Sequence, residues 1–281
     1  LQKVIRNKSL IARDELASAD VFIIAVPTPF IKNSNTIPKP DISFVLKAAE
    51  SIAKYIKDND VILIESTIPV GTTQKVAELI SEVSKLSWDQ FFIGHCPERV
   101  LPGKILFELV NNDRVIGGLR EKDNLKCSEV YKSFCKGRIY TTNAKTAELV
   151  KLAENSYRDT NIAFANELSM ISDKYGICPN ELISLANNHP RVNILKPGCG
   201  VGGHCIAVDP WFIVDSCPKE ANLIKTSREV NISKTLWVIS KIRNESKDFY
   251  KTLGRPPILG CFGISFKPNV DDLRESPALL I

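Results

Sequence analysis

Short apolar runs rich in β-branched residues alternate with amphipathic patterns in the first half of the chain, and this alternation constrains the fold more than any other feature. Residues 21–29 read VFIIAVPTP and residues 61–72 read VILIESTIPVGT, each closed by Pro, Thr or Gly. Residues 41–58, between them, carry apolar side chains at helical spacing. Further strands are expected at 91–100, 114–118 and 138–142. The pattern predicts an α/β fold with a parallel sheet covered on both faces.

The pattern changes at Asn143. Residues 143–175 contain neither Pro nor Gly, so we expect one long helix that ends at Gly176. A shorter helix is expected at 179–188 and another long one at 221–246, and PPILGCFGISF (256–266) has the composition of a new buried strand. We therefore expect an α/β domain at 1–142, a helical domain at 143–252 and the beginning of a second α/β domain at 253–281.

Composition excludes several classes of protein. The net charge of +5 is mild and no basic run indicates nucleic-acid binding. The eight cysteines form no CxxC pair, so no metal site is expected, and they are typical of reduced thiols in the cytoplasm. No apolar run has the length of a membrane span. The chain begins with Leu1 and ends within the apolar run PALLI, which we interpret as a fragment of a longer protein.

The stretch GVGGHCIAVDP (200–210) presents Cys205 after a glycine pair and before Asp209. Glycines permit sharp turns and close approach of another molecule to the backbone, which would make the thiol accessible. The alternative is a glycine-rich turn with a buried cysteine that serves only as a small apolar residue.

Lys151, Asn155 and Arg158 are spaced i, i+4 and i+7 in the long helical pattern, so they share one face. Such a face is often solvated surface. It can also point into a cleft, where a lysine transfers a proton and an asparagine orients an oxygen.

Polar side chains follow three expected strands: Thr28 the first, Glu65, Ser66 and Thr67 the second, and Glu98 with Arg99 the third. Ligands bind at the carboxyl ends of strands in open parallel sheets, although threonines also cap turns and helices. Other candidates are His189 and Arg191 before the cysteine stretch, and Lys267 and Arg274 near the end of the chain, where arginines suit phosphate or carboxylate. No GxGxxG sequence is present.

Seven segments of the chain carry a resemblance to a known family. They read AVPTPF, ESTIPVGTT, CPERVLPG, DRVIGG, AELVKLAENSYRDTNIAFANELS, HPRVNILKPGCGVGGHCIAVDPWFIV and FGISFKPNVDDLRESPA. In this order they closely resemble the UDP-glucose/GDP-mannose dehydrogenase family of nucleotide-sugar 6-dehydrogenases, over nearly the whole chain. Within the family, the segments around Glu98, His189 and Cys205 are most similar to members that act on UDP-N-acetyl-D-mannosamine.

The resemblance implies a Rossmann-like NAD-binding domain that lacks its first strand and glycine loop, a central helical dimerisation domain, and the start of a second Rossmann-like domain, which binds UDP. It also implies a cytoplasmic homodimer, a role in polysaccharide biosynthesis, and oxidation of a sugar C6 alcohol to the uronate with two NAD through a thiohemiacetal and a thioester on a cysteine.

The resemblance also implies the roles of individual residues. Cys205 matches the nucleophile, Lys151 the general acid/base, Asn155 the residue that holds substrate or oxyanion, Asp209 the one that assists proton transfer, and Glu98 a carboxylate used in hydrolysis. The substrate contacts match Lys151, Asn155, Arg99, Val100, Arg158, His189, Arg191, Gly202 and Lys267. The NAD contacts match Thr28, Thr67 and Arg274. Positive charge near Cys205 would favour its thiolate.

Two alternatives stay open at this point: a UDP-N-acetylglucosamine 6-dehydrogenase, and a non-catalytic remnant that keeps the dimer scaffold. The filled catalytic positions speak against the remnant. Because the first strand and glycine loop are missing, we expect the 281-residue chain alone to bind NAD weakly and to turn over little.

Overall fold

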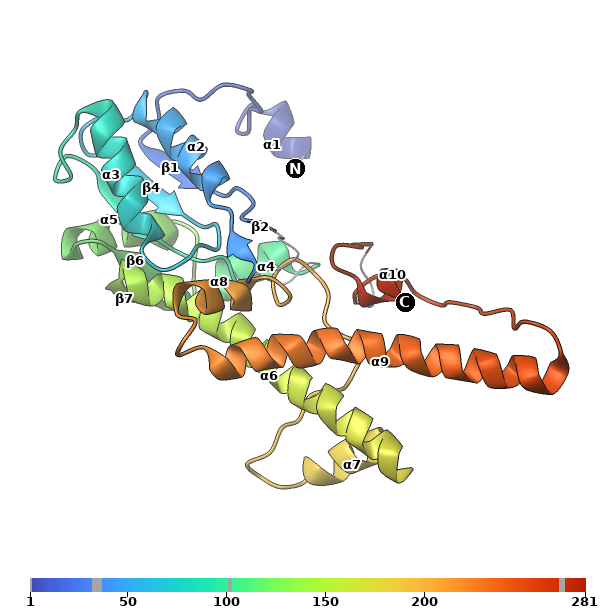
Figure 1. The fold of residues 1–281 in the computed structure, drawn as a ribbon. Coiled ribbons are helices and arrows are strands. Elements are labelled where there is room, and N and C mark those ends of the chain that lie inside the picture. Colours follow the sequence, from blue (N-terminus) through green and yellow to red (C-terminus); the bar gives the residue numbers. More distant parts are fainter. Residues whose placement is uncertain (1, 32–36, 101–102, 268–270) are drawn as a thin grey trace. The chain divides into compact units, whose positions relative to one another are not determined.

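A computed structural model describes residues 2–31, 37–100, 103–267 and 271–281 (Figure 1). The chain divides into two compact units, each described here by itself. The first unit comprises residues 1–28 and 42–149, and the second comprises 29–41 and 150–281. One boundary between the units falls within helix α6 (Ala144–Tyr175), between residues 149 and 150. The expected three-domain division stays a prediction.

The first unit is built on a five-stranded sheet of order β1-β4-β5-β6-β7. Its strands are β1 Val21–Ile24, β4 Val61–Ile64, β5 Phe92–His95, β6 Arg114–Gly118 and β7 Ile139–Asn143. The first three are parallel, whereas β6 pairs antiparallel with β5 and parallel with β7. The predicted α/β class is confirmed, and the reversed direction of β6 and β7 is the one departure from an all-parallel sheet.

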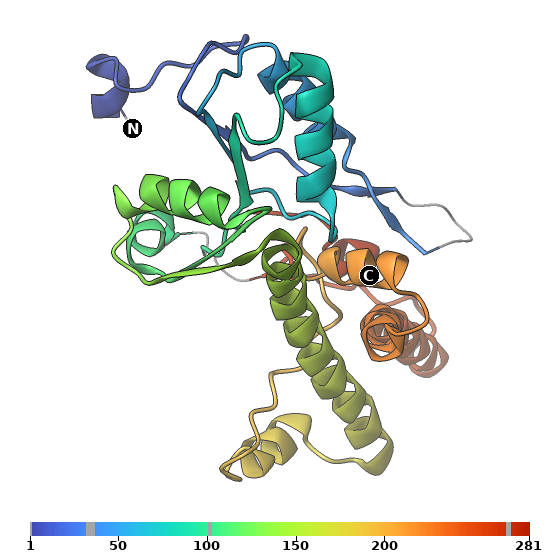
Figure 2. The same ribbon diagram turned by 90° about the vertical axis from the view of Figure 1, so that its left-hand side faces the viewer.

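Helices cover both faces of this sheet (Figure 2). On one face, α2 (Ser43–Ala53) and α3 (Thr72–Ser84) pack side chains such as Val45, Ile52 and Ile80 against Ile62 and Ile64. On the other, α5 (Glu121–Lys132) packs Cys127 and Tyr131 against residues of β4, β5 and β6. Two shorter helices are α1 (Gln2–Arg6) and α4 (Ile105–Asn111). Burial on both faces explains why the strands are continuous apolar runs.

The second unit is mainly helical. It contains most of α6 (Ala144–Tyr175), then α7 (Pro179–Ala186), α8 (Asp209–Ser216) and α9 (Asn222–Leu253). Gly176 has a φ of +67°, so the predicted glycine end of the long helix is confirmed. In Figure 1, α8 lies near the first half of α6 and α7 near its C-terminal end.

A small hairpin from an earlier part of the chain completes the second unit. Strands β2 (Phe30–Ile31) and β3 (Lys39–Pro40) pair antiparallel, and β3 contacts α8. Phe30 packs with a buried cluster of Leu152, Val208 and Phe212. This excursion was not predicted, because two-residue strands leave almost no periodic pattern.

The strand expected at 256–266 is wrong. The structure gives residues 255–266 no helix or strand, and Ile258 and Phe262 are 94% and 97% exposed. A strand needs a neighbour to pair with, and no described strand lies beside this segment. Among the described residues that follow it, the short helix α10 (Pro277–Leu280) is the one element. Across the described ranges, none of the helices combines the length and apolar character required to cross a bilayer.

Candidate functional site

Residues 198–209, here called the cysteine loop, turn at two glycines whose backbone conformation favours glycine. Gly200 and Gly203 have φ values of +137° and +84°, in the left-handed region. A Cβ at Gly200 would collide with Thr235 Oγ1, and one at Gly202 with the carbonyl of Glu275. The glycines are therefore required by neighbouring segments of the same unit. The sequence interpretation, in which they admit a ligand to the backbone, is not needed to explain them.

Cys205 lies just before α8. Its carbonyl oxygen accepts hydrogen bonds from the N–H groups of Val208 and Asp209, at 3.0 and 2.8 Å. Burial and the negative charge of Asp209 raise the pKa of its thiol, while the positive charges of Lys151, Arg274 and Arg158 lower it. The nearby cations lower this pKa and so favour the thiolate, as expected, but the net shift is upward. The cations do act on the sulfur, but burial outweighs them.

Asp209, the first residue of α8, is 4% exposed. Asn155 of α6 donates a hydrogen bond from Nδ2 to its Oδ2 at 2.6 Å. Burial raises the pKa of this carboxyl to about 6, although the Asn155 hydrogen bond and the charge of Lys151 lower it. A carboxyl that titrates near 6 can both accept and release a proton near neutral pH.

The N-terminal half of α6 supplies the other members of this group. Lys151 is half-buried, Asn155 is buried and Arg158 is exposed. The neighbour of Arg158, Asp159, occupies the buried position one turn after Asn155. The structure thus brings Lys151, Asn155, Cys205 and Asp209 together in one unit, with Arg158 at their edge.

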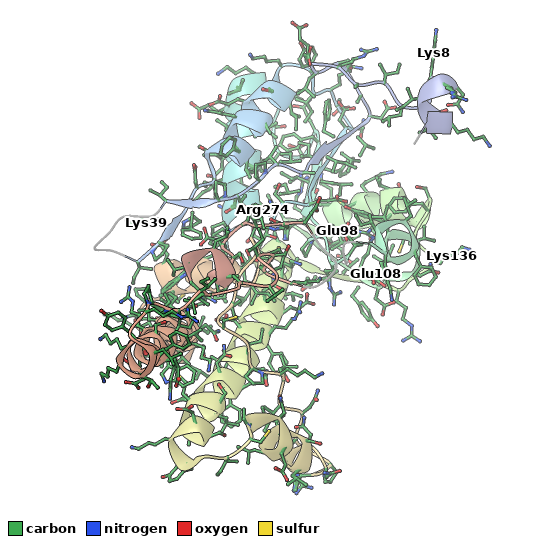
Figure 3. All side chains as sticks on the ribbon, turned by 90° about the vertical axis from the view of Figure 1, so that its right-hand side faces the viewer. Lys8, Lys39, Glu98, Glu108, Lys136 and Arg274 are labelled. Carbon is green, nitrogen blue, oxygen red and sulfur yellow. The ribbon has the colours of Figure 1, made fainter. Side chains whose placement is uncertain are left out.

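Arg274, labelled in Figure 3, lies beside the cysteine loop, where its carbonyl accepts a hydrogen bond from Gly203 N–H at 2.9 Å. Its guanidinium binds the Asp272 carboxylate, with Nη2 to Oδ2 at 2.6 Å, and this lowers the pKa of Asp272 to about 2. His204 Nδ1 lies 3.9 Å from the same carboxylate. Burial and the charge of Arg274 lower the pKa of His204.

Three other predicted substrate contacts are exposed, and two of them, His189 and Arg191, stand apart from this group. His189 and Arg191 lie in the turn after α7, where Arg191 N–H donates to His189 Nδ1 at 3.3 Å. Because α7 lies near the C-terminal end of α6, this turn is distant from α8 within the unit (Figure 1). Lys267 is exposed. The roles of all three residues stay predictions.

The first unit gathers polar groups at the carboxyl ends of β1 and β4. Thr28 Oγ1 donates to the carbonyl of Thr67 at 2.7 Å, and Ser66 Oγ receives the N–H of Val26 at 2.8 Å. Both threonines are partly exposed. Two adjacent hydroxyl-bearing loops at the carboxyl edge of parallel strands fit a dinucleotide.

The N-terminus of α3, which follows β4, cannot hold a phosphate because a carboxylate of the same unit already occupies it. Glu148 is fully buried and accepts hydrogen bonds from Gly71 N–H at 2.6 Å and from Thr73 N–H and Oγ1, both at 2.7 Å. These are the donors that a helix start offers to an anion. A dinucleotide pyrophosphate would therefore bind elsewhere on this edge.

Glu98, labelled in Figure 3, follows β5 and is held at both oxygens. Its Oε1 accepts the N–H groups of Arg99 and Val100 at 2.7 and 3.1 Å, and its Oε2 lies 3.6 Å from Arg114 Nη2. Its side chain is 30% exposed, which leaves it reachable by water. Arg114 is 5% exposed and lies over the ring of Tyr131 at 4.6 Å.

Tyr131 extends this arrangement to Glu65, another of the polar residues predicted at a strand end. The Tyr131 hydroxyl donates to Glu65 Oε1 at 2.7 Å. Burial raises the pKa of Glu65.

Sequence reasoning missed several of these buried polar groups. Asp159, Asn166, Arg228 and Asn231 form a hydrogen-bonded set between α6 and α9, and Glu148 caps α3. Asp159 lies at i+4 and Asn166 at i+11 from Asn155, so helical spacing alone could have placed them on the Asn155 face. Their partners on α9 carry no comparable signal.

Comparison with known proteins gives two matches to domain families. The NAD binding domain of the UDP-glucose/GDP-mannose dehydrogenase family matches residues 1–135, and the central domain of that family matches residues 145–233.

Individual proteins are also similar. A UDP-N-acetyl-D-mannosamine dehydrogenase of Campylobacter jejuni is 54% identical over 93% of this chain and 64% of its own length. An NDP-N-acetyl-D-galactosaminuronic acid dehydrogenase of Ralstonia nicotianae is 50% identical over 96% of this chain and 64% of its own length. The chain thus spans 64% of these relatives. The structure of a UDP-D-ManNAc dehydrogenase from Pyrococcus horikoshii aligns with a TM-score of 0.89 and 39% identity over 99% of this chain and 66% of that one.

Proposed function

Because the chain belongs to the UDP-glucose/GDP-mannose dehydrogenase family, we propose that it carries out the NAD-dependent oxidation of the C6 alcohol of UDP-N-acetyl-D-mannosamine to the uronate. The observation that carries the proposal is the group of four side chains in the second unit. There, Asn155 binds Asp209 at 2.6 Å, and the charge of Lys151 acts on both Asp209 and Cys205. A nucleophile, two proton-transfer groups and an amide donor are what covalent oxidation of an aldehyde requires.

The proposed first stage ends with the sugar attached to Cys205. Lys151 takes the proton of the C6 hydroxyl as a hydride leaves C6, which gives the aldehyde. The sulfur of Cys205 adds to that carbon, its proton passes to Asp209, and the former carbonyl oxygen takes the proton held by Lys151 as the thiohemiacetal forms. The raised pKa of the thiol makes a base necessary, and Asp209 is mostly ionised at pH 7.

In the proposed second stage the thiohemiacetal loses a hydride while Lys151 takes its hydroxyl proton, which leaves a thioester. Water attacks the thioester carbon, Glu98 is proposed to take its proton, the C–S bond breaks, and Asp209 returns to the sulfur the proton that it took in the first stage. Asn155 is the donor proposed to stabilise the negative charge on oxygen. Bound NAD supplies the hydride acceptor in both oxidations, and Thr28 and Thr67 are the residues of the first unit proposed to hold it.

The identity of the sugar is the part of the proposal with the least support, because the relatives are named for different substrates. Similar identities to a UDP-N-acetyl-D-mannosamine dehydrogenase and to an NDP-N-acetyl-D-galactosaminuronic acid dehydrogenase support an N-acetylhexosamine nucleotide. The mannosamine epimer rests on the motifs around Cys205. UDP-N-acetylglucosamine is the second candidate.

We also propose that the protein is a homodimer with α9 at its interface. Ile232, Leu236 and Tyr250 of α9 are 46%, 57% and 56% exposed. Ile232 and Leu236 lie one turn apart on one face of the helix, where they form a short apolar stripe that a second copy could cover. Tyr250 lies on the same face but is separated from them by the exposed Arg243.

The experiment is an assay of NADH formation by the full-length protein with UDP-N-acetyl-D-mannosamine and with its glucosamine epimer, alongside Cys205→Ser and the control Cys217→Ser. We expect two NADH per mannosamine nucleotide, turnover reduced at least 100-fold in Cys205→Ser, and normal turnover in the control, whose cysteine is exposed at the end of α8. Unchanged turnover in Cys205→Ser would remove the thiol from the mechanism.

A further inference from the structure

A buried line of polar side chains runs from α9 through α6 to the start of the cysteine loop. Arg228 Nη1 and Asn231 Nδ2 both donate to Asp159 Oδ1, at 2.6 and 2.8 Å. Asn166 Nδ2 donates to Asn231 Oδ1 at 2.8 Å. All four residues are at most 4% exposed. Breaking one of these hydrogen bonds would leave a buried polar group without its partner, which costs free energy of unfolding.

The charged end of this line fixes the direction of every hydrogen bond in it. An ionised carboxylate only accepts, so Asn231 must turn its Nδ2 toward Asp159 and its Oδ1 toward Asn166. Asn166 must then present its Nδ2 to Asn231. Its Oδ1 is left to accept the N–H of Gly198, at 2.8 Å. The Arg228–Asp159 ion pair therefore sets the orientation of the Asn166 amide through Asn231, which lies between them.

The bond to Gly198 places this line at the first residue of the cysteine loop, and Asn155 holds the last residue, Asp209. Asn155 and Asn166 are eleven residues apart on α6, which is about three turns and about 16 Å along one face. The loop thus lies along α6 with each end bound to an asparagine of the same face. A second contact, from Thr235 Oγ1 to the Cys199 carbonyl at 2.7 Å, holds the start of the loop to α9.

We propose that Asn166 is a positioning residue for Cys205. Asn166 fixes the start of the cysteine loop, so that the thiol stays beside Lys151 and Asp209. The Arg228–Asp159–Asn231 set in turn fixes the orientation of the Asn166 amide. The catalytic meaning of this role rests on the function proposed above, whereas its effect on the thiol does not.

The test measures the rate at which iodoacetamide alkylates Cys205, followed by peptide mass spectrometry across a pH series. Cys217 and Cys178, both exposed, serve as internal references in the same sample. The variants are Asn166→Ala and the milder Thr235→Val, which keeps the side-chain shape but removes the bond to Cys199. Asn161→Ala is the matched control, because its amide bonds only the Tyr157 carbonyl on the exposed side of α6.

We expect Cys205 to react about tenfold faster in Asn166→Ala and severalfold faster in Thr235→Val, because local opening of the loop becomes more frequent. The pH dependence of the reaction should move toward that of an ordinary thiol, since release from burial removes the main cause of the raised pKa. The two reference cysteines and the control variant should be unchanged. If Asn166→Ala does not fold, the Thr235→Val result decides.

Two results would overturn the proposal: a Cys205 rate and pH dependence equal to the wild type in the folded variants, or acceleration of Cys217 and Cys178 to the same extent as Cys205. Failure of the proposed function looks different. In that case the wild-type protein forms no NADH with the nucleotide sugars, while the alkylation of Cys205 still responds to Asn166→Ala.

Discussion

At the scale of single residues, burial sets the protonation of the groups around Cys205. The thiol is pushed toward its neutral form, and the Asp209 carboxyl titrates near pH 6. Placing a carboxyl where ionisation is unfavourable costs stability, and the protein tolerates this cost next to Cys205. Perturbed groups of this kind concentrate at functional sites.

Asp209 should make the protein less stable as pH rises from about 4 to about 6. Its pKa is about 6 when folded and near its ordinary value of 3.8 when unfolded, so the folded state binds the proton more tightly. The contribution is absent below the unfolded pKa and reaches a penalty of about 3 kcal/mol above the folded pKa. Asp209→Asn removes it. Urea unfolding at pH 4 to 7.5 should show the variant gaining stability relative to wild type across this window.

Asp215→Asn is the control for this measurement, because it makes the same change of carboxyl to amide in the same helix. Parallel curves for Asp209→Asn and the wild type would mean that Asp209 titrates normally in the folded protein.

At the scale of secondary-structure elements, Glu148 of α6 joins that helix to the start of α3. Glu148→Gln keeps one acceptor oxygen for three donors and removes a negative charge from a helix N-terminus. We expect the free energy of unfolding to fall by about 1–3 kcal/mol and amide exchange at Gly71 and Thr73 to accelerate. Hydrogen-exchange mass spectrometry measures the second effect.

Glu82→Gln, on the exposed side of α3, is the matched control and should change neither quantity. Exchange at Gly71 and Thr73 that is equally slow in both variants would show that Glu148 does not hold this helix.

The elements also show what sequence periodicity can predict. The strand β4 is four consecutive buried residues, and α6 has no helix breaker before Gly176, so both follow from local patterns. The spacing of Lys151 and Asn155 likewise predicted that these two side chains share one face of α6. Asp159 and Asn231 were missed because their role depends on how α6 packs against α9. The strand expected at 256–266 failed because apolar composition cannot supply a pairing partner.

At the scale of the whole molecule, the apolar stripe on α9 bears on assembly. We expect sedimentation velocity of the full-length protein at micromolar concentration to give a dimer, and Leu236→Lys to shift it toward monomer, because a charge would be buried in the interface. Asn244→Lys, exposed and away from this stripe, should leave the dimer intact. A monomer at all concentrations for the wild type would contradict the proposed interface.

The β2–β3 hairpin has a consequence for how the protein can be divided. Because residues 29–41 belong to the second unit, each unit is built from two separate stretches of chain. During translation the hairpin leaves the ribosome well before its packing partners Leu152 and Phe212 are synthesised. Phe30 therefore stays exposed to solvent while β4 and β5 are still being translated. Anyone who excises the sheet for separate expression should replace residues 29–41 with a short linker rather than simply cut the chain after residue 149.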